Sequence, residues 1–142
     1  MYSDFLNFKL DMASALLMER ANVVYRDHWD LDVRGLRVLR LIQASPDITP
    51  KEVSARALLE KTLLSKTLAI LESRELITRC PHPVDRRSVG LRTSAKGAQV
   101  AEESSVIGAA LEDRLVSTFS QHEREALNAL LSKLVNGLLP PT

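Results

Sequence analysis

The sequence predicts a mainly α-helical protein with one small β-hairpin, and three observations support that fold class. The chain has 142 residues, which suits one domain of ordinary size with a real core. It contains only 5 glycines and 6 prolines, and apolar residues recur at helical spacing between them. The segment 76–93 instead carries two short extended runs around a turn with two prolines.

The first half of the chain reads as three helices. A long first helix is predicted over 4–27, and "HWDLD" ends it. Asp32 is placed to cap a second helix over 33–44. After the breaker "SPDITP", Thr49 caps a short helix that runs from Pro50 to about Leu58, with proline at the first position, where a missing N–H costs nothing. The apolar positions at helical spacing in the first helix are Phe5, Phe8, Met12, Leu16, Leu17, Val23 and Val24, and the predicted inward side of the second is Leu36, Val38, Leu39 and Ile42.

The helix predicted over 61–74 is the most informative. At 100° per residue, Leu64, Leu68 and Leu71 fall within about 60° of arc and form a buried stripe. A solvated helix face normally mixes Glu with Lys. The opposite face here has small residues, hydroxyls and one lysine, so it suits close approach to something negatively charged. Its members are Thr62, Ser65, Lys66, Ala69 and Ser73.

The remaining elements are a hairpin and two further helices. "LITRC" and "SVGLRT" flank "PHPVDRR", which predicts the hairpin over 76–93. Ser94 is placed to cap a helix from 95 to about 117. Ser120, with Glu123 three residues later, forms a capping-box pattern at the start of a helix over 121–138. The apolar positions are Val100, Ile107, Leu111 and Leu115 in the former helix, and Leu127, Leu130, Leu131, Leu134 and Leu138 in the latter.

The charge is unevenly distributed. Residues 51–97 hold ten Lys or Arg and five Asp or Glu, a net charge of +5, whereas the whole chain carries only +1, so the flanks together carry −4. A basic middle between mildly acidic ends favours a module that faces a polyanion. The alternative is a chance excess of positive charge on solvated faces.

A short helix, a tight turn, a helix with a polar outer face and a basic hairpin form the layout of a winged helix-turn-helix. In that fold the second helix enters the major groove of DNA by its N-terminal end. The hairpin tip carries Arg86 and Arg87, which can reach the DNA backbone or the minor groove. Asp85 is predicted to brace one of them in a charge-assisted pair while the other reaches outward.

These residues resemble the MarR (multiple antibiotic resistance regulator) family of bacterial transcription factors. The matching motifs are Leu71-Glu72 at the end of the recognition helix, Asp85-Arg86-Arg87 in the wing, and Ser94-Ala95-Lys96-Gly97 at the start of the next helix. The resemblance extends over the whole length. The chain departs from the family pattern at Glu75, where Gly is common, at Thr93-Ser94, where Leu-Thr is usual, and at Gly90, where an apolar residue is commoner.

The resemblance implies a regulator that binds double-stranded DNA and is expected to be a repressor. Base contacts are expected from Thr62, Ser65 and Lys66, and Arg87 is expected in the minor groove. For each residue the alternative is ordinary surface solvation. The predicted DNA-binding set is Thr49, Lys51, Lys61, Thr62, Ser65, Lys66, Arg79, Arg86 and Arg87, with Asp85 as the wing brace.

The resemblance also implies a homodimer on a pseudo-palindromic operator. Residues 1–30 and 98–142 are then dimerisation helices, and 31–97 is the winged helix-turn-helix domain. The leucine-rich stripe of 121–138 and Phe5 and Phe8 would bury each other across the two-fold axis. The alternative is that these stripes pack only within one chain.

Members of the family are released from DNA by small effectors, so we expect an anionic aromatic molecule such as an aromatic carboxylate. The alternative for Tyr25 and Trp29 is simple core packing. A thiol switch at Cys80 is not expected, because the peroxide sensors of the family use a cysteine in the first helix, which has none here. The candidate effector residues are Tyr25, Arg26, His28, Trp29, Arg37 and Arg40.

Other classes of function find little support. His28, His82 and His122 are far apart, "HERE" is not the two-histidine zinc motif and no glycine-rich phosphate loop exists, so we expect no enzyme, cofactor or metal. No apolar run approaches the roughly 20 residues that cross a bilayer. The lack of a signal-peptide pattern and the single Cys80 favour the cytoplasm. The alternative function is a winged helix used for protein–protein contact without specific DNA binding.

Overall fold

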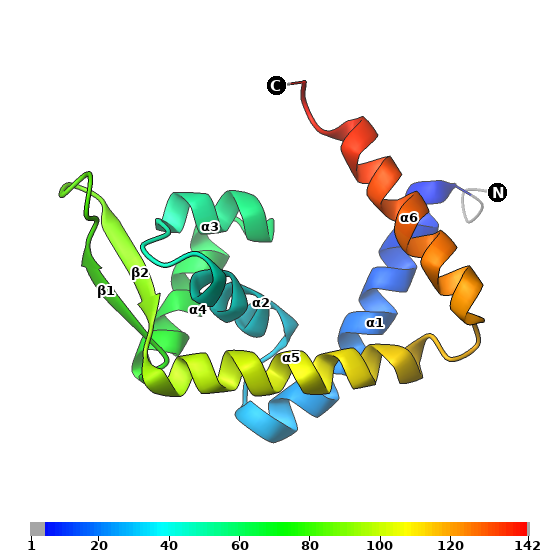
Figure 1. The fold of residues 1–142 in the computed structure, drawn as a ribbon, viewed down its shortest axis with the longest axis horizontal. Helices are drawn as coiled ribbons and strands as arrows, with labels where there is room; N and C mark the ends of the chain where they lie inside the picture. The colour runs from blue at the N-terminus through cyan, green and yellow to red at the C-terminus, as the bar shows by residue number, and fades with distance from the viewer. Residues whose placement is uncertain (1–4, 142) are drawn as a thin grey trace. The chain divides into compact units, whose positions relative to one another are not determined.

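The computed structural model describes residues 5–141, in which six helices and two strands form (Figure 1). The chain divides into two compact units, residues 1–108 and 109–142. The mainly helical fold class with a small hairpin is confirmed. In chain order the elements are α1 (Leu6–Trp29), α2 (Val33–Ala44), α3 (Pro50–Ala57), α4 (Lys61–Ser73), β1 (Ile77–Pro81), β2 (Val89–Thr93), α5 (Ala95–Leu115) and α6 (Gln121–Leu138).

The core of the first unit is built around α2, which contacts α1, α3, α4 and β2. Four of its side chains are fully buried, and they are the four that helical periodicity predicts: Leu36, Val38, Leu39 and Ile42. Complete burial of such side chains removes them from water, which is the main stabilising contribution in a domain of this size. The helix α2 is therefore the central helix against which the other elements of the unit pack.

Side-chain caps fix where the helices begin, and the predicted ones are confirmed. The Asp32 carboxylate accepts a hydrogen bond from the backbone N–H of Gly35 at 2.8 Å. Thr49 and Ser94 accept in the same way from the third residue of α3 and of α5, at 3.2 and 3.0 Å. The starts of α2, α3 and α5 are therefore local properties of the sequence.

The first helix differs from the prediction at its C-terminal end. It continues to Trp29, two residues beyond the predicted end, because Asp30 takes a left-handed conformation and its N–H bonds to the Arg26 carbonyl. Asp tolerates that conformation better than most residues. The predicted start at residue 4 lies outside the described residues. At the other helix ends, α4 and α5 stop at Ser73 and Leu115, within two residues of the predicted positions.

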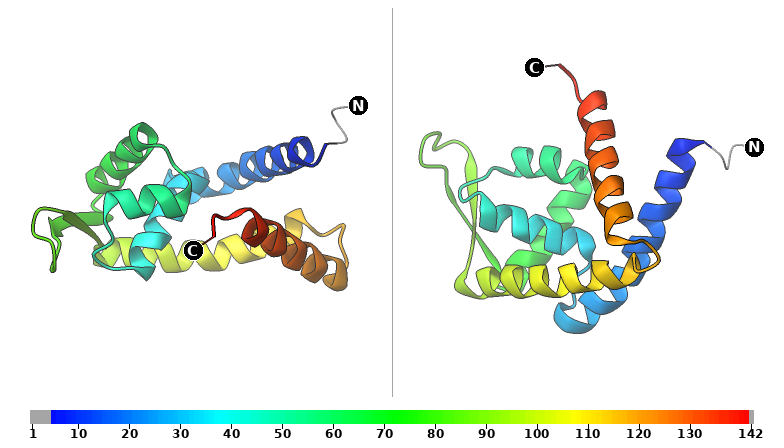
Figure 2. Two further views of the ribbon diagram at one scale, coloured as in Figure 1. Left: turned by 90° about the horizontal axis from the view of Figure 1, so that it is seen from above. Right: turned by 45° about the vertical axis from the view of Figure 1, so that its right-hand side comes forward.

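The wing is an antiparallel pair in which Ile77 lies opposite Thr93 and Pro81 lies opposite Val89. Figures 1 and 2 show it projecting from the helices of the first unit. It is anchored at Leu91, which is fully buried. Leu91 also forms an isolated bridge to Ile48, with N–H···O bonds of 2.9 Å in both directions between Leu91 and the Asp47–Ile48 segment. The loop before α3 therefore pairs with the free edge of the hairpin.

Glycine is required where α5 meets the start of the wing. A Cβ atom on Gly97 would collide with the carbonyl oxygen of Leu76 and lie 2.9 Å from its carbonyl carbon. That oxygen also accepts a hydrogen bond from the N–H of Ser94 at 2.9 Å, so it cannot move aside freely. The Gly97 of the family motif is thus explained by close packing of backbone against backbone.

The second unit consists of the end of α5, a short connection and α6. Arg124 on α6 forms an ion pair with Asp113 at 2.6 Å. The predicted capping box is confirmed, since Ser120 and Glu123 satisfy each other's backbone N–H groups at 3.1 and 2.9 Å. These hydrogen bonds hold the pKa of the Glu123 carboxyl below its usual value. None of the described helices has both the length and the apolar character needed to cross a membrane.

We predict that Gly97→Ala lowers the free energy of unfolding by about 1–3 kcal/mol, because the added methyl group has no space. Gly35→Ala is the matched control, since a Cβ there meets only ordinary contacts of 3.5 Å or more, and it should raise stability by up to about 1 kcal/mol. Urea unfolding followed by circular dichroism at one protein concentration measures both. Equal stability of the two variants would contradict the packing argument.

Candidate nucleic-acid interface

The helix α4 separates a buried side from a polar exposed side, as its sequence predicts. Leu64, Leu68 and Leu71 are at most 3% exposed and pack into the core. The opposite side chains, all exposed, are Thr62, Ser65, Lys66, Ala69 and Ser73. Lys61 is also exposed, at the first position of the helix. The structure therefore presents hydroxyl groups and two ammonium groups together at the N-terminal half of α4.

The first turn of α4 has no side-chain cap. Its N-cap residue is Glu60, whose side chain makes no capping hydrogen bond, although its carbonyl accepts from Leu64 N at 2.9 Å. The N–H groups of that turn are therefore left to an external acceptor. Together with the helix dipole, such groups favour a phosphate oxygen.

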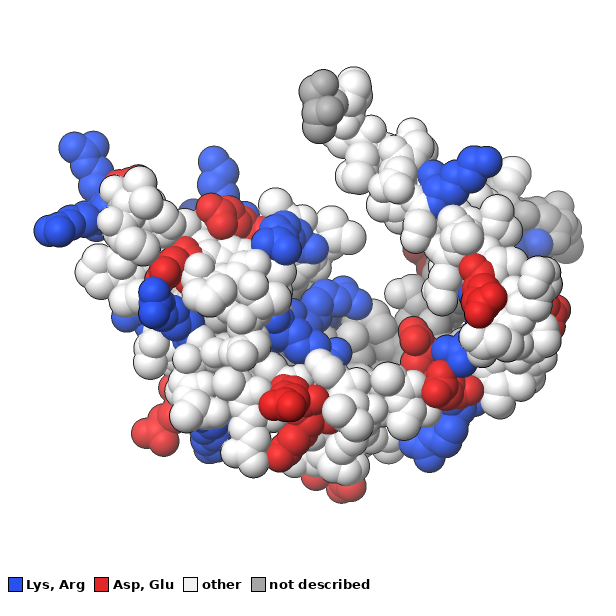
Figure 3. All heavy atoms as spheres, in the orientation of Figure 1, with Lys and Arg blue, Asp and Glu red and all other residues white. Residues whose placement is uncertain are grey.

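The turn at the tip of the wing is held by Asp85. One carboxylate oxygen accepts from the backbone N–H of Arg87 and the other from the hydroxyl of Ser88, both at 3.1 Å. Asp85 thus braces the wing through backbone and hydroxyl groups, where the sequence predicted an ion pair with a guanidinium. Arg86 and Arg87 are exposed. Figure 3 shows cationic side chains projecting from the end of the hairpin.

A second brace of the tip, His82, was missed by sequence reasoning. Its ring Nδ1 accepts from the backbone N–H groups of Val84 and Asp85, at 3.2 and 3.1 Å. Its own backbone N–H donates to the Ser88 carbonyl at 3.0 Å. In the sequence, His82 stands out only as a potential catalytic or metal-binding group. Its position beside a proline turn was the signal that could have revealed the brace.

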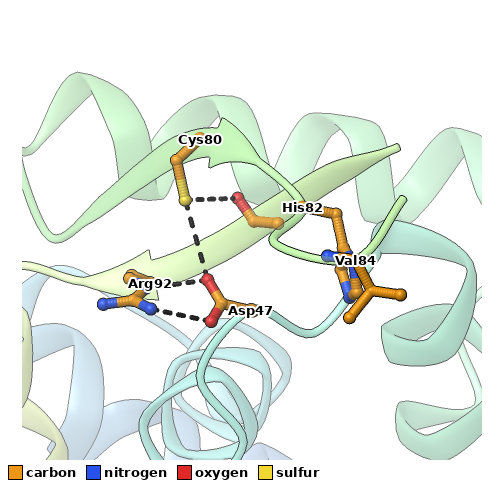
Figure 4. A network of polar contacts seen from close by, with 6 residues as sticks. Asp47, Cys80, His82, Val84 and Arg92 are labelled. Atoms are coloured by element: carbon orange, nitrogen blue, oxygen red, sulfur yellow. Dashed lines mark hydrogen bonds and ion pairs between the residues drawn. The ribbon is translucent and has the colours of Figure 1, made fainter. Parts of the chain in front are cut away.

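The root of the wing is held by an ion pair between Asp47 and Arg92 (Figure 4). Arg92 donates from Nε and Nη2 to the two carboxylate oxygens, each at 2.7 Å. The Cys80 thiol points to the same carboxylate at 3.8 Å and to the Gly90 carbonyl at 3.5 Å. Asp47 itself has a left-handed backbone, with φ of 69°. The pair joins the loop before α3 to strand β2.

Bidentate hydrogen bonds from Arg92 hold the pKa of the Asp47 carboxyl below its usual value, and the same pairing raises the pKa of Arg92. A carboxyl whose pKa is lower in the folded state stabilises the fold above its unfolded pKa. That contribution is therefore present at neutral pH and is lost as the pH falls through the folded pKa of Asp47. The wing root is an acid-sensitive attachment.

Three of the predicted DNA-binding side chains lie outside α4, and two of them already have partners within the chain. The hydroxyl of Thr49 is occupied in capping α3. The guanidinium of Arg79 forms an ion pair with Glu72 of α4. Lys51 is exposed near the start of α3. Lys51 is therefore available to an external anion, whereas Thr49 and Arg79 already have partners within the chain.

The six candidate effector residues do not gather at one site. Tyr25 is buried, and the Arg40 guanidinium carbon lies 5.6 Å from its ring centre. Arg40 lines a cavity of about 480 Å³ with residues of α2 and α5. Arg37 is exposed on α2. A different cavity, of about 410 Å³, is lined by Arg26, Asp27, His28, Trp29, Asp30, Arg74, Leu76, Lys96 and Val100.

Two comparisons with solved structures find the same fold along nearly the whole chain. A MarR/EmrR family transcriptional regulator from Acinetobacter sp. ADP1 superposes with a TM-score of 0.84 and 22% identity, covering 97% of each chain. A cysteine-to-serine mutant of Escherichia coli MarR, crystallised with operator DNA, gives a TM-score of 0.81 and 23% identity, covering 94% of this chain and 97% of the other. Among curated proteins, the transcriptional regulator HosA of Escherichia coli O111:H- is 27% identical over 107 residues, 75% of this chain and 79% of HosA.

A polar helix face and a basic hairpin carried on a buried helical core define a winged helix-turn-helix protein. The family model described as MarR family matches residues 29–88, from the end of α1 to the wing turn. The matched segment includes the motifs at Leu71-Glu72 and Asp85-Arg86-Arg87. Residues 29–88 thus match the MarR family of transcriptional regulators, and the chain shares the fold of the MarR structures named above.

Proposed function

We propose that this protein is a homodimeric repressor of the cytoplasm that binds a pseudo-palindromic operator and is released by a small anionic aromatic effector. The observation that carries the proposal is the joint exposure of the polar side of α4 and of the arginines at the wing tip. Both lie in the segment 51–97, which carries a net charge of +5. Such a surface suits the phosphates and base edges of a DNA duplex.

The DNA contacts divide by chemistry. Thr62, Ser65 and Lys66 project from α4 and can hydrogen-bond base edges in the major groove. Lys61 and Lys51, with the uncapped N–H groups of α4, suit phosphate oxygens. The wing arginines extend the contact, Arg87 to the minor groove and Arg86 to the backbone. A protein of the same fold, the Escherichia coli MarR mutant, has been crystallised with operator DNA, which supports a DNA-binding role for this chain.

The dimer proposal rests on apolar side chains that the single chain leaves exposed. α6 has no buried residue, and Leu130 and Leu138 are 64% and 76% exposed. Large exposed apolar faces mark interaction sites. A second copy covering them makes residues 1–30 and 98–142 the dimerisation part and 31–97 the DNA-binding part. On α1 the exposed apolar side chains are Leu6, Phe8, Met12, Leu16, Leu17 and Val23, with Phe5 just before the helix.

The effector site is placed at the cavity that contains Trp29. Trp29 is half-buried and offers an aromatic face, while Arg26, His28 and Lys96 supply cationic or hydrogen-bonding groups for a carboxylate. Tyr25 is assigned to the core, because it is only 6% exposed. An effector acts here only by binding the DNA-incompetent arrangement more tightly than the competent one.

We predict that Arg87→Ala weakens binding to a duplex selected from random DNA by about tenfold or more, because a guanidinium contact is lost. Arg114→Ala is the control, since it removes an equal charge outside the segment 51–97 and should leave affinity unchanged. Mobility-shift titrations at several salt concentrations measure the affinity, and the salt slope should fall by about one for Arg87→Ala. Unchanged affinity would remove Arg87 from the interface. Failure of the unmodified protein to bind any duplex at low salt would favour the protein–protein alternative.

We predict that Leu130→Glu converts the dimer into a monomer, because it places a charge in the apolar face of α6. Ala129→Glu is the matched control, since at 100° per residue it is exposed roughly 160° away from the centre of the leucine stripe of the same helix. Size-exclusion chromatography with light scattering gives the mass of each variant. A dimer that survives Leu130→Glu, or an unmodified protein that is monomeric, contradicts the proposed interface.

We predict that aromatic carboxylates change the fluorescence of Trp29, the single tryptophan, in a saturable way and release the selected duplex. The corresponding carboxamides are the control, because they keep the ring and lose the charge. A flat fluorescence response across a panel of aromatic acids would exclude Trp29 from the effector site.

A further inference from the structure

Four non-glycine residues within 5–141 have a left-handed backbone, and two of them, Leu58 and Glu75, are not aspartates. They are Asp30, Asp47, Leu58 and Glu75. Aspartate tolerates this conformation because its short side chain can hydrogen-bond locally. Leu58, with φ of 56° and ψ of 45°, terminates α3 at a position where glycine is usual. A leucine there costs conformational free energy that a glycine would not.

The strain at Leu58 is not offset by packing. Its side chain is 87% exposed, whereas the next residue, Leu59, is only 5% exposed and enters the core. Ser54 holds the turn in place, because its carbonyl accepts from the N–H groups of both Leu58 and Leu59 and its hydroxyl donates to the Leu59 carbonyl. The backbone is thus fixed by Leu59 and Ser54, and it directs the side chain of Leu58 to solvent.

The location of Leu58 suggests what its exposed side chain contacts. It lies in the turn between α3 and α4, three residues before Lys61 and next to the uncapped start of α4. In the proposed function this end of α4 enters the major groove, so the turn faces the same duplex. The apolar group that base edges present in the major groove is the C5 methyl of thymine.

The geometry points to Leu58 as a specificity-determining residue that makes an apolar contact with a thymine methyl group in the operator. This inference rests on the proposed function, because it requires a duplex at α4. Lone exposed leucines are common on protein surfaces and need no explanation by themselves. Here the exposed left-handed residue lies at the entry of the recognition helix, where its side chain faces the proposed duplex, whereas Glu75 has the same backbone beyond the other end of α4.

Two substitutions at Leu58 distinguish the effect of losing the apolar contact from the effect of relieving the backbone strain. Leu58→Gly relieves the strain and removes the side chain, and Leu58→Asn tolerates the left-handed conformation but replaces the apolar group with a polar one. Glu75→Gly is the matched control, since Glu75 has φ of 60° beyond the opposite end of α4 and is also exposed. Leu58→Gly and Glu75→Gly should both unfold at higher urea concentration than the unmodified protein.

The probes are duplexes selected from random DNA by the unmodified protein, and the same duplexes with each thymine replaced in turn by deoxyuridine. We expect one replacement to lower the affinity of the unmodified protein by about fourfold, the worth of one buried methyl group. Leu58→Gly and Leu58→Asn should bind the thymine duplex about fourfold more weakly and should not distinguish it from the deoxyuridine duplex. Glu75→Gly should keep both the affinity and the discrimination.

The outcomes separate the two proposals. If the unmodified protein binds no duplex, the proposed function fails. If it binds and both Leu58 variants bind equally well, the contact at Leu58 is disproved while the proposed function stands. If both variants bind more weakly but no thymine replacement matters to any protein, Leu58 does not read a thymine methyl group and the inference is overturned.

Discussion

The attachment of the hairpin to the helical core at Leu91 is the constraint on which the candidate interface depends. Leu91 is fully buried, pairs with Arg79 across the hairpin and bridges to Ile48 on its other edge. The ion pair of Asp47 and Arg92 reinforces the same junction. A DNA-binding surface made of a helix and a separate hairpin reads a duplex only if the offset between them is fixed. Because β2 is paired on both edges, backbone hydrogen bonds fix the position of the hairpin relative to the helical core.

The elements of the fold could be predicted because their signals are local. The caps at Asp32, Thr49 and Ser94 each involve residues three positions apart, and the burial of Leu64, Leu68 and Leu71 follows from helical periodicity. The pair Asp47 and Arg92 could not be found, since 45 positions separate its members and Asp47 stood in a stretch that read only as a helix breaker. The effector candidates could not be grouped correctly for a similar reason. Helical periodicity predicts which side chains are exposed, but it does not predict which cavity they line.

The roles of side chains that accept hydrogen bonds from the backbone were also harder to predict from the sequence. Asp85 was predicted to engage a guanidinium, and it holds the backbone of Arg87 instead. His82 accepts two backbone N–H groups, so its ring orders the turn that displays the arginines. In a hairpin turn, unpaired backbone N–H groups need acceptors, and short polar side chains within the turn are the nearest ones. A sequence shows opposite charges more readily than it shows hydrogen-bond acceptors. In this turn, however, the need to pair the backbone N–H groups decides where the side chains of His82 and Asp85 lie.

The contact between Gly97 and the Leu76 carbonyl has a mechanical consequence. Because no gap separates the first turn of α5 from the residue that precedes β1, these two segments behave as one rigid joint. The first turn of α5 and the base of the hairpin are therefore expected to move together. The absence of a side chain at Gly97 thus couples the start of α5 directly to the segment that begins the wing.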